Sequence, residues 1–297
     1  MTTKTILFLL CCCSYLISSV TLAGGASVIG NGAGIVENNI QFGYSSLPDL
    51  VSECLRTSRC EISPSEAKSL SKMLTVLSIN ASNAERIVYV SEKENPGFFD
   101  TGVNEKHRIA KTGLTPSDPI YINTDLLYNE KGQPNLDLPT IVSILLHEVG
   151  HQTGEQNHAF LDIIGSKLKK MLSQKLDIHS IVLSDDSYLE VTIINHKFPF
   201  LISDLMISWQ GVGTKNLSQA INTSITCTEG DLSGLEIFNG HFTSISISEA
   251  DKKIGFGIWI NLSCYSETEN KSFVETKSME LEIGKDLSVK ILNFGDL

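Results

Sequence analysis

The chain has 297 residues, enough for one large domain or two domains of ordinary size, each with its own core. Its hydrophobic fraction of 41% excludes a polytopic membrane protein and a disordered chain. The formal net charge of −11 opposes the binding of polyanions, so we expect no nucleic-acid partner.

The first 23 residues have the features of an export signal. Lys4 provides the positive start, an apolar run follows, and Thr-Leu-Ala before Gly24 places small residues at a cleavage position. The apolar run is near the length that spans a bilayer, so a retained membrane anchor is the alternative. Serine residues interrupt the run, and this favours cleavage. We therefore predict a secreted or periplasmic protein without a stable membrane span after the signal is removed.

The cysteines outside the predicted signal number four. An even number of cysteines in an oxidising compartment predicts two disulfides. Proximity in sequence favours Cys54–Cys60 and Cys227–Cys264, although four cysteines permit three pairings. A zinc site built from these cysteines is the weaker alternative, because none of them belongs to a C-x-x-C pair.

A glycine-rich segment, residues 24–34, follows the predicted signal. It resembles a nucleotide-binding loop only superficially, because no strand precedes it and no helix pattern follows, so we expect a flexible mature N-terminus. Residues 47–57 have helical spacing. A second helix begins at a capping box with Ser63 as the cap, Pro64 as the first helical residue and Glu66 three residues after the cap.

Two strands and two helices are predicted next. β-Branched and aromatic residues indicate strands at residues 86–92 and 120–128. A helix begins at Asp137 or Leu138, with Pro139 in its first turn. Beyond it, apolar residues at three-and-four spacing predict an amphipathic helix that packs into a core: Phe160, Ile163, Ile164, Leu168, Met171, Leu172 and Leu176.

The pattern changes near residue 178. From Ile181 onward the chain has short alternating runs separated by turn residues, which is typical of an antiparallel β-sandwich or barrel. This part also has an acidic excess and no arginine, which supports a boundary at the same place. We therefore predict an α+β protein with one domain at residues 24–178 and a β-rich, sandwich-like C-terminal domain at residues 179–297.

One short motif, H-E-x-x-H at His147, Glu148 and His151, carries most of the chemical information. Residues four apart lie on one face of a helix, so the two imidazoles can bind one zinc ion. Glu148 projects beside them, where its carboxylate can accept a proton from a water activated by the metal. Gly150 leaves room for close packing, and Gly154 can adopt the positive φ that ends a helix.

The sequence HEVGHQTGEQNH resembles the zinc-binding motif of zincin metallopeptidases, most closely the metzincin pattern H-E-x-x-H-x-x-G-x-x-H. The third ligand of that pattern falls on Asn157, whose amide binds zinc weakly, and His158 follows one residue later. Asp162, and less strongly Glu155, are carboxylate alternatives. Four residues match position for position: His147, Glu148, His151 and Gly154.

The resemblance implies a zincin-like catalytic domain at residues 24–178 that holds Zn²⁺ through His147, His151 and His158, with Glu148 as the general base. It extends loosely to PIYINTD, residues 119–125, which is similar to the edge strand that holds peptide substrates in zincins. The methionine turn of metzincins has no clear counterpart here; the two candidates are Met171 and Met206.

The function implied by this resemblance is a secreted zinc-dependent metallopeptidase that acts on protein or peptide substrates. Two alternatives remain open: another metal-assisted amide hydrolysis, for example of a cell-wall peptide, and a surface or binding protein in which the metal is structural. Tyr121, Tyr128 and His196 are candidates for assisting an oxyanion, and no pattern selects among them. The remaining histidines are isolated, and we expect them to be structural or exposed: His107, His179 and His241.

Overall fold

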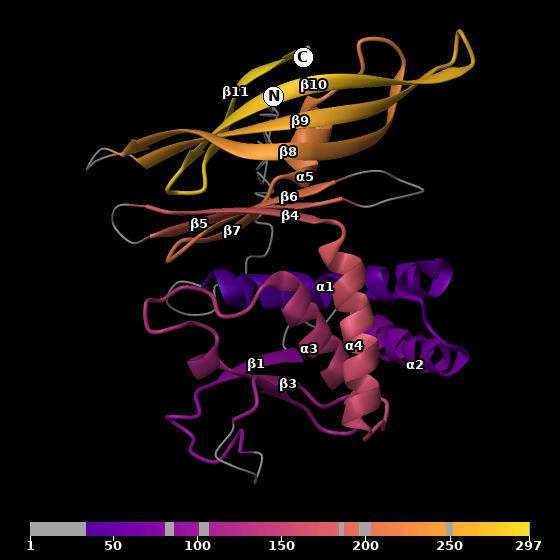
Figure 1. The fold of residues 1–297 in the computed structure, drawn as a ribbon, viewed down its shortest axis with the longest axis vertical. Helices are drawn as coiled ribbons and strands as arrows, with labels where there is room; N and C mark the ends of the chain where they lie inside the picture. The colour runs from indigo at the N-terminus through magenta and orange to yellow at the C-terminus, as the bar shows by residue number, and fades with distance from the viewer. Residues whose placement is uncertain are drawn as a thin grey trace, which may run out of the picture.

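The structure is a computed structural model that describes residues 34–80, 86–100, 107–183, 187–195, 203–247 and 252–296. The predicted export signal, most of the glycine-rich segment and His196 lie outside the described residues. The described chain is a mixture of helices and sheets in which helices dominate the first half and antiparallel sheets dominate the second (Figure 1).

The described residues of the first half form four longer helices, two 3-10 turns and a small sheet. The helices are α1 (Ile35–Arg56), α2 (Pro64–Asn80), α3 (Leu138–Gln152) and α4 (His158–Ser173), and the 3-10 turns are η1 (Ser58–Cys60) and η3 (Thr124–Leu126). The strands are β1 (Ile87–Val90), β2 (Ala110–Lys111) and β3 (Ile120–Asn123).

Helix α1 begins directly after Gly34, so the expectation that no helix pattern follows the glycine-rich segment was wrong. Its buried apolar residues, among them Val36, Ile40 and Leu47, recur at helical spacing and pack into the core of the helical half. Pro48 lies inside the helix. Burial of the apolar face therefore outweighs the helix-breaking tendency of this proline.

The predicted starts of α2 and α3 are confirmed at the level of their capping hydrogen bonds. The backbone N–H of Ser63 donates to Glu66 Oε2 at 2.5 Å, and the N–H of Glu66 approaches Ser63 Oγ at 3.4 Å, which is the reciprocal capping box. In α3 the side chain of Asp137 accepts the N–H of Thr140 at 2.9 Å. Both helix starts are thus encoded by local sequence.

The three-stranded sheet has the order β1-β3-β2, with β1 parallel and β2 antiparallel to β3. The segment expected to be an edge strand, Ile120–Asn123, is therefore the central strand, and that expectation was wrong. The edges are β1 and β2, and β2 has only two residues and no recognisable alternating pattern. Residues of the β2 edge, not of β3, line the cavity described below.

The second half forms two four-stranded antiparallel sheets, as the alternating runs predicted. The first sheet contains β4 (Leu176–Val182), β5 (Tyr188–Ile194), β6 (Asp204–Trp209) and β7 (Gly213–Asn216). The second contains β8 (Asp231–Ile247), β9 (Lys252–Ser266), β10 (Lys271–Gly284) and β11 (Val289–Asp296), and the short helix α5 (Ser218–Ser224) connects the two. The sequence predicted that Leu176 belongs to the amphipathic helix. This was wrong, because α4 ends at Ser173 and Leu176 begins β4.

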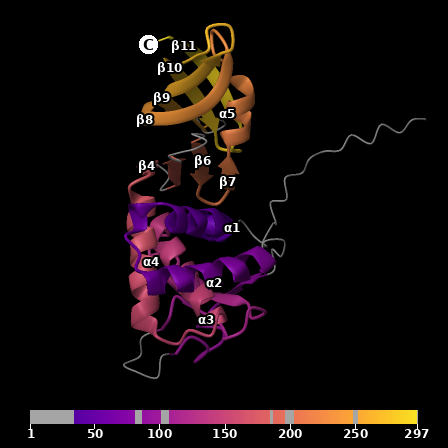
Figure 2. The ribbon, with the colours of Figure 1, turned by 90° about the vertical axis from the view of Figure 1, so that its right-hand side faces the viewer.

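The layers stack in the order helices, first sheet, second sheet (Figures 1 and 2). Apolar residues from the facing sides of both sheets, such as Trp209, Phe256 and Met279, share one buried core. Ile194 and Met206, from the other side of the first sheet, join the core of the helical half instead. The first sheet is therefore buried on both sides.

Both expected disulfides are present, Cys54–Cys60 and Cys227–Cys264, which is consistent with an oxidising compartment. The first closes a turn after α1, and the second links the segment before β8 to β9. Within the described residues, no helix combines the length and the apolar character needed to cross a membrane.

Candidate metal centre

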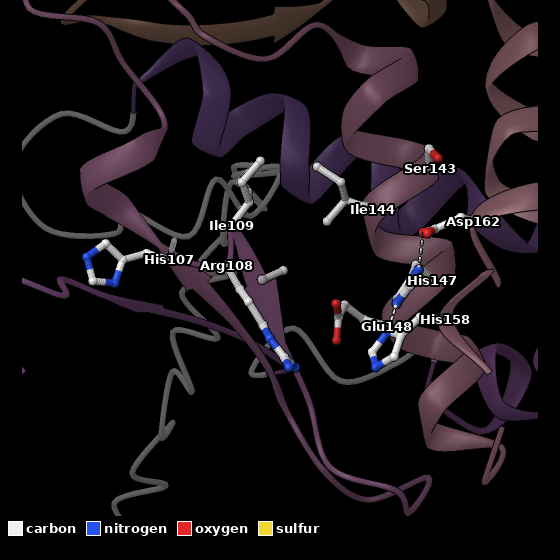
Figure 3. A pocket seen from close by; sticks show the side chains of 10 residues that line it. His107, Arg108, Ile109, Ser143, Ile144, His147, Glu148, His158 and Asp162 are labelled. Atoms are coloured by element: carbon white, nitrogen blue, oxygen red, sulfur yellow. Dashed lines mark hydrogen bonds and ion pairs between the residues drawn. The ribbon is translucent and has the colours of Figure 1, made fainter. Parts of the chain in front are cut away.

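Three histidines predicted as metal ligands lie together at one end of α3 and the start of α4. Figure 3 shows two of them, His147 and His158. Nε2 of His147 lies 3.1 Å from Nε2 of His151 and 3.0 Å from Nδ1 of His158. The third side of this triangle, from Nε2 of His151 to Nδ1 of His158, measures 3.3 Å. Three imidazole nitrogens thus converge on one point.

The size of this triangle fits a tetrahedral zinc ion. Zinc–nitrogen bonds of about 2.0 Å in tetrahedral geometry place the ligand nitrogens about 3.3 Å apart. The three observed separations lie at or just below this value. Imidazole is also a preferred zinc ligand, so these residues can hold the ion and leave a fourth position open.

Local sequence explains why His158 reaches the two helical histidines despite the extra residue. Gly154 has φ of +85° and reverses the chain after α3. Asn157, at the family position of the third ligand, caps α4 by accepting the N–H of Phe160 at 3.2 Å. His158 is therefore the first residue of α4.

Two oxygen atoms fix the orientation of the α3 imidazoles. Oδ1 of Asp162 lies 2.8 Å from Nδ1 of His147, and the backbone carbonyl of Glu155 lies 2.7 Å from Nδ1 of His151. Both oxygens can only accept a hydrogen bond, so each Nδ1 carries the hydrogen and each Nε2 presents its lone pair. The side chain of Glu155 instead accepts backbone N–H groups of its own loop.

Glu148 is buried beside the histidines, with 7% of its surface exposed. Burial raises the pKa of its carboxyl group to about 7, and the positive charge of Arg108 opposes this shift. Burial also lowers the pKa values of His147 and His151, which favours neutral, ligand-competent imidazoles. A carboxylate with a pKa near neutrality is suited to accept and return a proton.

A cavity of about 480 Å³ opens in front of Glu148, between α3, the start of α4 and the segment that leads into β2. Its apolar wall comes from Ile109, Ala110 and Ile144. Figure 3 shows the carboxylate of Glu148 facing this space and the ring of His107 pointing away from it. The cavity can admit a ligand to the histidine cluster.

The two tyrosines that the sequence offered for assisting an oxyanion make packing contacts away from the cavity. The hydroxyl of Tyr128 contacts Glu37 and accepts the N–H of Val36 at 3.0 Å, so it is bound to α1. Tyr121 packs edge-on against Phe98. Neither tyrosine lines the cavity, and the two candidates for a methionine turn lie in α4 and β6.

Arg108 is the site residue that sequence reasoning missed. It enters the cavity from the edge of the small sheet, forty residues before Glu148 in the chain. No local motif marks it, because only the packing of the sheet against α3 brings it near Glu148. Asp162, which the sequence offered as an alternative third ligand, instead lies beside Nδ1 of His147.

The chain was also compared with known proteins. No protein family model matches it, and neither a curated protein nor a solved structure matches it.

Proposed function

We propose that this protein is a secreted zinc-dependent metallopeptidase whose metal is held by His147, His151 and His158. The observation that carries the proposal is the triangle of three imidazole nitrogens, 3.0 to 3.3 Å on a side, next to a buried glutamate. The resemblance of the motif to that of zincins and the two disulfides support the same function.

The chemistry follows from the positions of the side chains. Zinc at this place would act as a Lewis acid that lowers the pKa of water and polarises a substrate carbonyl. Glu148 accepts the proton of the attacking water and passes it to the leaving amine. Asp162 and the carbonyl of Glu155 keep the His147 and His151 rings in the orientation that the metal needs.

Two features favour catalysis over a structural metal site. A structural zinc site is usually closed by four protein ligands, whereas three histidines converge here within the described residues. A structural site also has no use for a buried carboxylate such as that of Glu148, which is costly to bury beside a cavity. We therefore prefer a hydrolase to a binding protein in which the metal is structural.

Metal content and peptidase activity, measured on the same purified samples, test the proposal. Glu148→Gln should retain one equivalent of zinc and lose activity, whereas His147→Ala should lose both. The matched controls are Glu130→Gln and His241→Ala, at exposed positions outside the cavity, which should behave as wild type. Full activity of Glu148→Gln would refute the mechanism.

The substrate panel must separate peptide hydrolysis from hydrolysis of a cell-wall amide, because the same side chains can perform both. Unfolded protein, short peptides and peptidoglycan fragments should therefore be compared with the same zinc-loaded enzyme. We expect cleavage of protein or peptide substrates. Cleavage of peptidoglycan fragments alone would replace the peptidase assignment by the cell-wall alternative.

A further inference from the structure

The backbone at Arg108 is held in place just before β2. Its N–H donates to the carbonyl of Phe99 at 3.0 Å, and its carbonyl accepts the side-chain amide of Asn123 at 3.3 Å. Asn123 itself is completely buried at the end of β3. The Arg108 side chain therefore projects from a fixed point, although the residue is exposed.

The guanidinium group of Arg108 lies in the cavity without a partner. Figure 3 shows it pointing into the space in front of Glu148 and His158. It forms no hydrogen bond and no ion pair with any residue that the structure describes.

Arg108 is also the one lysine or arginine among the described residues that line the cavity. Because the chain as a whole carries a net charge of −11, long-range attraction does not draw anions to this protein. An anion that enters the cavity must therefore be attracted locally. A guanidinium group is the side chain best matched to a carboxylate, since it can donate two parallel hydrogen bonds.

The surroundings of Arg108 define where such a carboxylate would lie. The neighbouring wall, formed by Ile109, Ala110 and Ile144, offers no charged group. Glu148, His147 and His158 occupy the opposite side, with Asp162 next to His147 (Figure 3). A substrate amide placed at Glu148 would thus have its flanking group, and not its scissile bond, within reach of Arg108.

We propose that Arg108 binds a carboxylate of the substrate next to the scissile bond, so that the site selects anionic peptides. This inference rests on the proposed function, because it names the substrate class of the same site. The carboxylate can be the C-terminus of the peptide or the side chain of Asp or Glu. Arg108 is in either case a specificity-determining residue and takes no part in proton transfer.

The test measures peptide binding to the zinc-loaded Glu148→Gln protein, which should bind without cleaving. Three peptides of one sequence are compared: an amidated neutral peptide, the same peptide with a free C-terminus, and the amidated peptide with a glutamate beside the scissile bond. Calorimetry at pH 8 should give at least one carboxylate peptide a dissociation constant about tenfold lower than that of the neutral peptide. The peptide that gains affinity identifies the source of the carboxylate.

Variants at position 108, made in the same background, separate Arg108 from the metal as the anion receptor. Arg108→Gln should abolish the preference, and Arg108→Glu should reverse it in favour of a lysine-containing peptide. Arg56→Gln, at the exposed end of α1, is the matched control and should keep the preference. Thermal melting confirms that each variant is folded.

Two outcomes overturn the inference: carboxylate peptides that bind no better than the neutral one, and a preference that survives in Arg108→Gln. If carboxylate peptides bind no better than the neutral peptide but wild type still hydrolyses neutral peptides, the proposed function stands and only the inference fails. If wild type hydrolyses no peptide but carboxylate binding still depends on Arg108, the peptidase function is removed and the binding role of Arg108 is supported. The two failures are thus distinguishable.

Discussion

The buried carboxyl group of Glu148 gives a quantitative prediction for the metal-free protein. Its pKa is raised from 4.5 to about 7, so the folded state binds a proton more tightly than the unfolded state does. The resulting stability is fully present below pH 4.5 and is lost as the pH rises through 7. The whole effect is at most about 3.4 kcal/mol, of which about 2.5 kcal/mol is lost between pH 5 and pH 8.

Replacement of Glu148 by glutamine removes this dependence, because an amide of the same shape does not ionise. We expect the stability of Glu148→Gln relative to wild type to increase by about 2.5 kcal/mol between pH 5 and pH 8. Urea unfolding in the presence of a chelator measures this difference, and comparison at each pH cancels the contributions of the histidines. Glu130→Gln, at an exposed position, is the control that should show no such change.

The physical reasoning would fail if the stability difference between wild type and Glu148→Gln were the same at pH 5 and pH 8. That result would mean that Glu148 ionises as freely in the folded chain as in the unfolded chain. The carboxylate would then be solvated, and burial would not prepare it for proton transfer.

Three further predictions concern the ligands, the turn and the disulfides. His158→Ala should abolish tight zinc binding, whereas Asp162→Asn should weaken it only about tenfold, as competition with a zinc chelator will show; a stronger loss in Asp162→Asn would make the carboxylate the third ligand. Gly154→Ala should lower the free energy of unfolding by about 1–2 kcal/mol because φ is +85°, while Gly295→Ala, in an open position without positive φ, should be nearly neutral in the same urea titration. Loss of Cys227–Cys264, whose cysteines are 37 residues apart, should lower the free energy of unfolding by about 4 kcal/mol, and loss of Cys54–Cys60, with a separation of 6, by about 2 kcal/mol. Urea unfolding of the two double-alanine variants measures both values, and equal losses would contradict the loop-entropy reasoning.

The parts of the fold that the sequence predicts well depend on nearest neighbours along the chain. The cap residues Ser63 and Asp137, the positive φ of Gly154 and the Cys54–Cys60 disulfide all follow from short-range signals. The capping signal at Asn157 is equally local, although this residue was considered only as a possible ligand. Attention to its role as a cap would have placed His158 on a helix.

The parts that the sequence could not predict depend on tertiary packing. The long helix α1 exists although Pro48 lies within it, because its apolar face is buried against α3 and the first sheet. The short edge strand β2 pairs through only two residues, too few for a pattern. The position of Arg108 depends on that strand, so nothing in the sequence could place it opposite Glu148.

The position of His158 in the first turn of α4 has a consequence for the kinetics of metal exchange. Helix ends open and close far more often than helix centres, and here the first turn is secured by the side chain of Asn157. Opening of this turn would withdraw one ligand and leave the other two on α3 undisturbed. Zinc would then escape through local fraying without global unfolding, and the cap at Asn157 would set the lifetime of the bound ion.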